Sequence, residues 1–144
     1  MDAASPAREA LRAAGLRVTR PRVQVYDTLA RLGGHRTADD VAEAVAGAGQ
    51  RLSRMSVYNA LGAMRAAGLV MAADAGPGAA LYEVATHWHH HFVCRSCGAV
   101  ADVPCAEGHK PCLEATVPGA DIDEAQVIFR GICADCLAVD ENAF

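Results

Sequence analysis

Two Cys-x2-Cys pairs constrain this chain more than any other feature of its sequence. They are Cys94–Cys97 and Cys133–Cys136, and four histidines, at position 87 and at positions 89 to 91, stand directly before the first pair. Thiolate and imidazole are preferred ligands of zinc and other late transition metals. Four thiolates in two such pairs predict a closed structural zinc site that ties the end of the chain to an earlier strand. The alternatives are buried free thiols or two disulfides of a redox protein.

Length and charge predict two small domains of different character. The 144 residues suffice for one ordinary domain or two small ones. Residues 1–70 hold ten arginines against six acidic residues, whereas residues 71–144 hold three basic residues against eleven acidic ones. This split favours a first half that faces nucleic acid, with ordinary surface variation as the alternative. No run of signal-peptide or membrane-spanning type is seen, so we expect a cytoplasmic protein without a membrane partner.

The first half has the start and stop signals of four helices. They are expected at residues 7–14, 20–33, 38–46 and 54–67, with Thr19, Thr37 and Ser53 as N-caps and glycines at their ends. Two short apolar strands follow at 69–72 and 80–84, separated by Gly-Pro-Gly at 76–78. This order predicts a winged helix-turn-helix over residues 1–84. Its helix from residue 54 would then enter the major groove of DNA with its N-terminus first.

Candidate DNA contacts cluster in two places. At the start of the fourth helix, the polar residues available for bases and phosphates are Ser53, Arg54, Ser56, Tyr58 and Asn59. Three arginines at the start of the second helix, Arg17, Arg20 and Arg22, are expected near the DNA backbone or the minor groove. The alternative for Tyr58 is a partly buried core position, which is disfavoured because the apolar stripe of this helix already runs through Val57, Leu61 and Met64.

The second half, residues 85–144, reads as a small α/β domain, so the whole chain is expected to be α+β. Strands are predicted at 89–94, 98–103 and 125–132, and a short helix at 111–116. His89 and His91 share one strand face, and His90 points the other way. Pairing Cys94 with Cys97 across the turn sets position 89 opposite 102 and position 91 opposite 100, which puts Asp102 on the same face. Two imidazoles and a carboxylate suit Fe(II), Mn(II) or Zn(II).

Taken together, the motifs resemble the ferric uptake regulator (Fur) family of metal-dependent dimeric repressors. The resemblance covers nearly the whole chain and is carried by residues 15–22, 35–41 and 53–61, the histidine-rich strand that runs into the first Cys pair, and the final Cys pair. It implies a homodimer on a palindromic operator, held together by the second domain. It also implies a regulatory metal site made of His35, Glu83, His89, His91 and Asp102. Metal bound to both domains would fix the angle between them.

The residue at position 102 distinguishes branches of this family. An aspartate there resembles the peroxide-sensing branch, and residues 101–105 and 128–133 look like actinobacterial regulators of catalase-peroxidase genes. The resemblance implies Fe(II) or Mn(II) as the regulatory ion, with Zn(II) or Ni(II) as further possibilities. It also implies that peroxide oxidises His89 and His35 and releases DNA. The alternatives are a regulator of iron, zinc or nickel homeostasis, and a thiol-based redox regulator using Cys105 and Cys112, which we expect instead to be small buried residues.

The sequence departs from the family pattern at two places, and two other classes of protein have to be weighed against the resemblance. A further metal site of the family needs a histidine where this chain has Asp-Glu-Ala-Gln at 123–126, and we expect no substitute from positions 87, 90, 109 and 124. Asn59 stands where arginine is common, which predicts an altered operator preference. A zinc deaminase would need a His-x-Glu motif that the sequence lacks, so we expect no enzyme. A zinc-ribbon module without DNA binding is disfavoured by the basic first half.

Overall fold

The computed structural model describes residues 5–73, 80–85, 89–106, 115–122 and 125–141. The chain divides into two compact units, Met1–Thr86 and His87–Phe144. Both combine helices with a small sheet, as the α+β prediction requires. Within the described ranges, no helix is long and apolar enough to cross a membrane.

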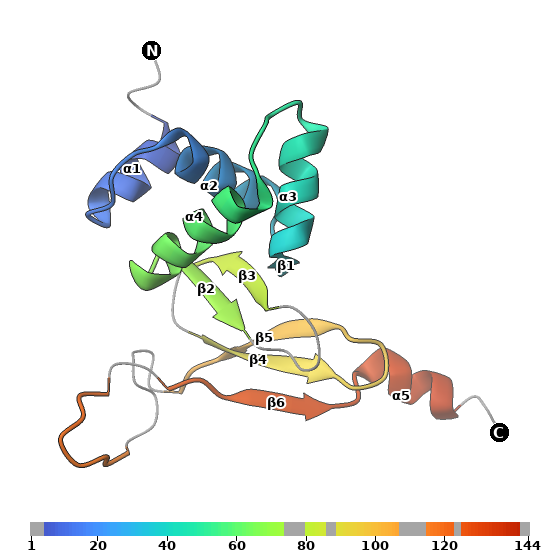
Figure 1. Cartoon of the computed structure of the whole chain (residues 1–144). Helices are drawn as coiled ribbons and strands as arrows, with labels where there is room; N and C mark the ends of the chain where they lie inside the picture. The colour runs from blue at the N-terminus through green and yellow to red at the C-terminus, as the bar shows by residue number, and fades with distance from the viewer. Residues whose placement is uncertain (1–4, 74–79, 86–88, 107–114, 123–124, 142–144) are drawn as a thin grey trace. The chain divides into compact units, whose positions relative to one another are not determined.

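The first unit contains the four predicted helices and the predicted hairpin strands (Figure 1). The elements in chain order are α1 (Pro6–Ala13), α2 (Arg20–Leu32), β1 (Arg36–Thr37), α3 (Ala38–Gly47), α4 (Arg54–Ala66), β2 (Val70–Ala73) and β3 (Leu81–Val84). The three predicted N-caps are confirmed, because the hydroxyls of Thr19, Thr37 and Ser53 each accept a backbone N–H from the first turn of their helix. The predicted turn at 76–78 lies outside the described residues.

The core of the first unit lies between the helices. The fully buried side chains come from every helix and from the first strand of the hairpin: Leu11, Val25, Leu29, Val41, Val45, Val57, Leu61, Met64 and Val70. They recur at three- and four-residue spacing on α3 and α4, which is why the apolar stripes were visible in the sequence. The core therefore fixes which face of α4 points outward.

The sheet of the first unit has the order β1-β3-β2. Its edge strand β1, only two residues long, was not predicted from the sequence. In this strand Arg36 pairs with Tyr82 and Thr37 with Leu81, antiparallel to β3. Such a short segment carries no periodicity of its own and becomes a strand only because β3 offers it a partner. Continuing the register by one residue sets His35 opposite Glu83.

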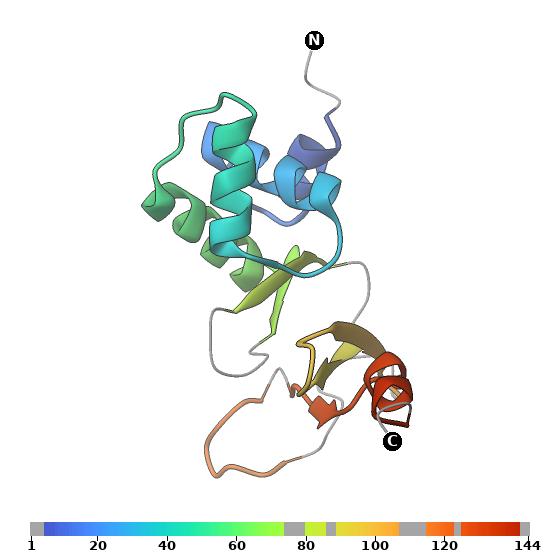
Figure 2. The ribbon, with the colours of Figure 1, turned by 90° about the vertical axis from the view of Figure 1, so that its right-hand side faces the viewer.

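The second unit is a three-stranded sheet followed by a helix. Its elements are β4 (His89–Cys94), β5 (Val100–Pro104), β6 (Ile128–Gly131) and α5 (Ala134–Glu141), and the sheet order is β5-β4-β6. Strand β4 is antiparallel to β5 and parallel to β6. Both views show the red helix α5 at the end of the sheet where β4 and β6 finish (Figures 1 and 2).

Three details of the second unit differ from the sequence prediction. The register of β4 against β5 is shifted by two residues, because Val93 pairs with Val100 and His91 pairs with Asp102. The turn is wider than predicted: Cys94 N–H donates to the carbonyl of Ala99, not to Cys97. Strand β6 is shorter than 125–132, and α5 was not predicted at all. The predicted helix at 111–116 lies largely outside the described residues.

Candidate metal centres and nucleic-acid interface

The four cysteines of the two Cys-x2-Cys pairs meet at one end of the second sheet. Their sulfur atoms lie within 4.8 Å of one another. Cys94 Sγ is 3.9 Å from Cys136 Sγ, and Cys97 Sγ is 3.8 Å from Cys133 Sγ. Zn–S bonds of about 2.3 Å place the sulfurs of a tetrahedral site about 3.8 Å apart. The cluster therefore has the donor set and the spacing of a closed zinc site.

Backbone N–H groups prepare one of these sulfurs to be a thiolate. The N–H groups of Cys97 and Cys133 point at Cys94 Sγ, at 3.5 and 3.3 Å. These donors lower the pKa of the Cys94 thiol to about 6. Opposite it, the Ser96 hydroxyl favours ionisation of Cys136, but contact with the thiol of Cys133, desolvation and the other two sulfurs outweigh this and raise its pKa to about 12. A cation is what allows all four sulfurs to ionise together.

Strand pairing brings a carboxylate to two histidines of β4. His89 Nε2 lies 3.1 Å, and His91 Nε2 lies 3.9 Å, from the same oxygen, Oδ1 of Asp102. The two imidazole rings are 5.0 Å apart in an edge-to-face arrangement. A hydrogen bond accounts for the 3.1 Å distance from His89 but not for the 3.9 Å distance from His91. Ligand atoms that share one ion at about 2.1 Å lie about 3.0 to 3.5 Å apart, so the set also suits a metal.

His90 is engaged on the other face of β4, as its position in the strand predicts. Its Nδ1 accepts the backbone N–H of Val127 at 3.1 Å. Burial, followed by the nearby imidazoles of His91 and His89, lowers the pKa of His90. A lowered pKa keeps the ring neutral, and only a ring with an unprotonated Nδ1 accepts this hydrogen bond. The role of His90 is therefore to hold the segment before β6 against β4.

In the first unit, His35 faces Glu83 across the β1–β3 edge. His35 Nε2 is 3.3 Å from Glu83 Oε2. The segment is held by Arg36, whose guanidinium donates to the carbonyls of Gly33 and Leu32 at the end of α2. Directly after it, Thr37 and Asp40 form a reciprocal capping box at the start of α3. His35 is thus placed by a strand pairing on one side and by two helix ends on the other.

The DNA-contact candidates of α4 occupy its outward face and first turn. Tyr58 is 46% exposed, so the alternative of a core tyrosine is wrong. Ser53 and Ser56 are bonded to each other at the N-cap. Arg54 is paired with Asp39 of α3 at 2.5 Å.

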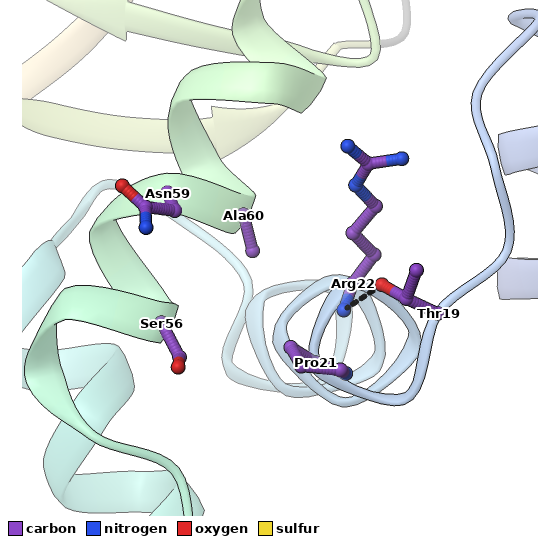
Figure 3. A pocket seen from close by; sticks show the side chains of 6 residues that line it. All are labelled: Thr19, Pro21, Arg22, Ser56, Asn59 and Ala60. Carbon is purple, nitrogen blue, oxygen red and sulfur yellow. Dashed lines mark hydrogen bonds between the residues drawn. The ribbon is translucent and has the colours of Figure 1, made fainter.

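A hollow separates α4 from the start of α2. It has a volume of about 240 Å³ and is lined by Thr19, Pro21, Arg22, Ser56, Asn59 and Ala60. Figure 3 shows Ser56, Asn59 and Ala60 along α4, opposite Pro21 and Arg22 at the first turn of α2. Arg22 also donates to the carbonyl of Arg17 at 2.8 Å. Three of the eight DNA-contact candidates, Arg22, Ser56 and Asn59, therefore line this hollow, while Arg20 is exposed on the same first turn of α2.

Other residues singled out in the sequence have different outcomes. Cys105 is only half-buried and is disulfide-bonded, so the expectation of a small buried thiol is wrong for it. Cys112, His87, His109 and Glu124 lie outside the described residues. The sequence reading missed Arg36 and the Thr37–Asp40 capping box as the parts that position His35. The Thr-x-x-Asp spacing was the available signal for the box.

Comparison with known proteins identifies the family. Residues 13–129 match the ferric uptake regulator family. The transcriptional regulator FurA of Mycobacterium tuberculosis is 46% identical over 136 residues, covering 93% of this chain and 92% of that protein. The peroxide operon regulator of Bacillus subtilis is 30% identical over 134 residues, covering 89% of each protein.

Solved structures agree with the sequence relatives. The ferric uptake regulator of Pseudomonas aeruginosa with manganese is 28% identical, has a TM-score of 0.69, and covers 90% of this chain and 98% of that one. A zinc uptake regulator complexed with zinc and DNA has the same fold, with a TM-score of 0.65 at 20% identity over 94% of this chain and 93% of that one. The chain belongs to the ferric uptake regulator family of metal-responsive transcriptional regulators.

Proposed function

We propose that this protein is a dimeric transcriptional repressor that binds a palindromic operator when a regulatory metal ion is bound. The observation that carries the proposal is a pair of incomplete ligand sets. His35 and Glu83 face each other in the first unit, and His89, His91 and Asp102 converge in the second. Fe(II) and Mn(II) commonly take five or six ligands in total, so neither set alone fills the coordination of such an ion. In this proposal, one ion would take its ligands from both sets.

The proposed mechanism is coupling through shared ligands. His35 and Glu83 of the first unit and His89, His91 and Asp102 of the second would hold the same ion, and this shared coordination would restrict the relative orientation of the units. In a homodimer this sets the separation of the two α4 helices, which must match two half-sites of DNA. Metal then shifts the population toward the DNA-competent arrangement by as much as it binds that arrangement more tightly.

The cysteine cluster has a separate, structural role in this proposal. Zn(II) held by Cys94, Cys97, Cys133 and Cys136 ties α5 and the end of β6 to the β4–β5 turn. The second unit needs this support because, among its described residues, large apolar side chains such as Phe129, Leu137 and Val139 remain exposed. The same exposed side chains supply apolar area for a homodimer interface.

DNA binding is assigned to the first unit. The proposed contacts are the α4 residues Ser53, Arg54, Ser56, Tyr58 and Asn59, with Arg17, Arg20 and Arg22 toward the backbone or minor groove. The excess of arginine in residues 1–70 supports this assignment, because phosphate contacts dominate affinity for DNA. A cytoplasmic location follows from the proposed function.

Peroxide is the proposed signal. Asp102 occupies the position at which the resemblance separates the peroxide-sensing branch, and a peroxide operon regulator of Bacillus subtilis is among the relatives. Fe(II) held by the five proposed ligands would supply the first electron to peroxide. By the resemblance, the imidazole of His89 or of His35 would take up one oxygen atom of peroxide, with water as the other product, and an oxidised ring is a poorer ligand. Loss of these ligands releases the two units and therefore the operator.

The alternative is a metal-homeostasis regulator without peroxide chemistry. A structural relative from Pseudomonas aeruginosa was solved with manganese and is a ferric uptake regulator, and the donor set of two or three imidazoles and two carboxylates accepts several divalent ions. Thiol-based regulation is a weaker alternative, supported only by the disulfide at Cys105.

Operator binding with and without peroxide separates these functions. Protein loaded with Fe(II) or with Mn(II) is titrated with an operator duplex before and after low peroxide, and the peptides containing His35 and His89 are then weighed by mass spectrometry. Loss of binding with Fe(II) only, with one added oxygen on a histidine, supports peroxide sensing. Binding that needs metal and survives peroxide supports homeostasis. Loss with either metal that a reductant reverses supports the thiol alternative.

A further inference from the structure

The outward face of α4 carries a large apolar side chain that the core does not use. Met55 is 68% exposed, and Tyr58 on the next turn is 46% exposed. Residues three and four apart share one face of a helix, so Met55, Tyr58 and Asn59 lie together. The opposite face, which includes Val57 and Leu61, is fully buried. The exposed face is therefore fixed in direction by the core.

The chemistry of this face is selective among the four bases. Guanine is read in the major groove by arginine or lysine, adenine by asparagine or glutamine, and the thymine methyl group by apolar side chains. The basic residue in the first turn of α4, Arg54, is paired with Asp39, and the next, Arg65, lies in the last turn. The face thus offers an amide and a thioether where a guanine-reading helix offers a guanidinium.

We propose that Met55 and Asn59 form a two-residue reader of an A·T-containing step in each half-site. The Asn59 amide pairs with adenine through two hydrogen bonds, and the end of the Met55 side chain packs on a thymine methyl group. This inference rests on the proposed function, in which α4 enters the major groove. It adds Met55 as a residue that determines specificity and assigns a base to Asn59.

In the bidentate pairing, the Asn59 side-chain N–H donates to adenine N7, and its carbonyl oxygen accepts the N6 amino proton. Met55 lies one turn before Asn59, nearer the N-terminus that enters the groove first. One turn later, Gly62 is exposed, and a Cβ built there would meet nothing within 4 Å. A glycine at this place leaves the helix backbone able to approach the groove wall, because no side chain stands between them.

The hollow beside Asn59 orients this reader. Asn59 lines it together with Ser56 of α4 and with Thr19 and Arg22 of α2 (Figure 3). The hydroxyl and guanidinium groups at its rim are suited to phosphate oxygens, and such contacts fix register without reading sequence. The base-reading groups thus lie on α4, and the phosphate-facing groups of α2 and α4 lie beside them around the hollow.

A single exposed methionine is also common on ordinary protein surfaces. The two explanations differ in what the side chain does in the complex. A reader loses affinity when only the methyl group of thymine is removed, whereas a passive surface residue does not. Val117, which is 54% exposed in the second unit, provides a matched control for an exposed apolar side chain.

The test uses full-length, zinc-replete protein loaded with Mn(II). Operator duplexes are first selected from a randomised library, and each thymine is then replaced by uracil, and each adenine by 7-deazaadenine, one at a time. Burying one methyl group is worth about 0.8 kcal/mol, so we expect wild type to bind about fourfold more weakly with uracil at one position per half-site. We expect about tenfold weaker binding with 7-deazaadenine at a neighbouring position.

The variants assign these losses to side chains. Met55→Ala is expected to bind thymine and uracil duplexes equally at that position, while Met55→Leu and Val117→Ala keep the difference. Asn59→Ala is expected to become indifferent to 7-deazaadenine, and Asn59→Arg to select guanine in its place. Unchanged thermal unfolding would show that each variant is folded.

Two results would overturn the proposal. One is a wild type that never distinguishes thymine from uracil, and the other is a Met55→Ala variant that keeps the full difference at every position, which would assign the methyl contact to Tyr58. A wild type that enriches no duplex from the library would overturn the proposed function itself. If only the Met55–Asn59 proposal is wrong, the wild-type protein still enriches duplexes from the library.

Discussion

Asp102 is the residue whose charge matters most to the proposed regulatory site, because both imidazoles of β4 lie near one of its oxygens. Asp102→Asn keeps the size and an oxygen ligand but removes the negative charge. We expect Mn(II) affinity to fall by about tenfold or more, since ligand charge is a main determinant of divalent-ion binding. Calorimetric titration with Mn(II) measures this.

Asp121→Asn is the matched control for that experiment. Asp121 is exposed and lies in the loop between β5 and β6, away from the three β4–β5 ligands in sequence. The Asp121→Asn variant should bind Mn(II) with the affinity of the wild-type protein. Wild-type affinity in Asp102→Asn would remove Asp102 from the site and leave its contact with His89 as a simple hydrogen bond.

The site residues of the second unit were predictable to the extent that strand geometry fixes them. The face shared by His89, His91 and Asp102 follows from the two-residue period of strands. The predicted register of β4 against β5 was wrong by two residues. The backbone N–H of Cys94 donates to Ala99, so the turn is wider than a pairing of Cys94 with Cys97 implies. An even shift leaves every side chain on its face, so the predicted set survived the error. The disulfide at Cys105 had no such local signal.

At the scale of elements, the capping box before α3 is the device closest to His35. In Thr37→Ala, the Asp40 N–H loses its side-chain acceptor, and we expect the free energy of unfolding to fall by about 1 kcal/mol. Thr37→Ser keeps the hydroxyl and should stay near wild type. Urea unfolding followed by circular dichroism measures both. Equal stability of the two variants would mean that the box does not support this helix.

The helices of the first unit were predictable because residues at or near each helix end signal where the helix begins and ends. Thr19, Thr37 and Ser53 mark helix starts, and the buried stripes of α3 and α4 repeat with helical spacing. By contrast, β1 depends on a partner strand far along the chain. Helix α5 has no apolar periodicity, and its first residues looked only like the spacer of a Cys pair. Tertiary contacts, including those of Cys136, account for such an element.

At the scale of the molecule, the two units differ in how they are stabilised. The first has a continuous apolar core, whereas among the described residues of the second the buried apolar side chains are Val93 and Cys94. We expect removal of zinc from the metal-loaded protein to unfold the second unit and spare the first. Hydrogen exchange with mass spectrometry checks this, by comparing peptides from α3–α4 with peptides from β4–β5.

Zinc added back should restore slow exchange in β4 and β5, which separates reversible unfolding from aggregation. Simultaneous loss of protection in α3 and α4 would show that the first unit also depends on the cysteine cluster.

The parallel pairing of β4 with β6 has a consequence for the order of synthesis. Cys133 and Cys136 are made about forty residues after Cys94, their partner across the cluster. By then every described strand and helix of the first unit has already been synthesised. A chain that ends before Cys133 would therefore contain the whole first unit but only part of the second. The proposed zinc site can therefore form only after the chain has been synthesised through Cys136.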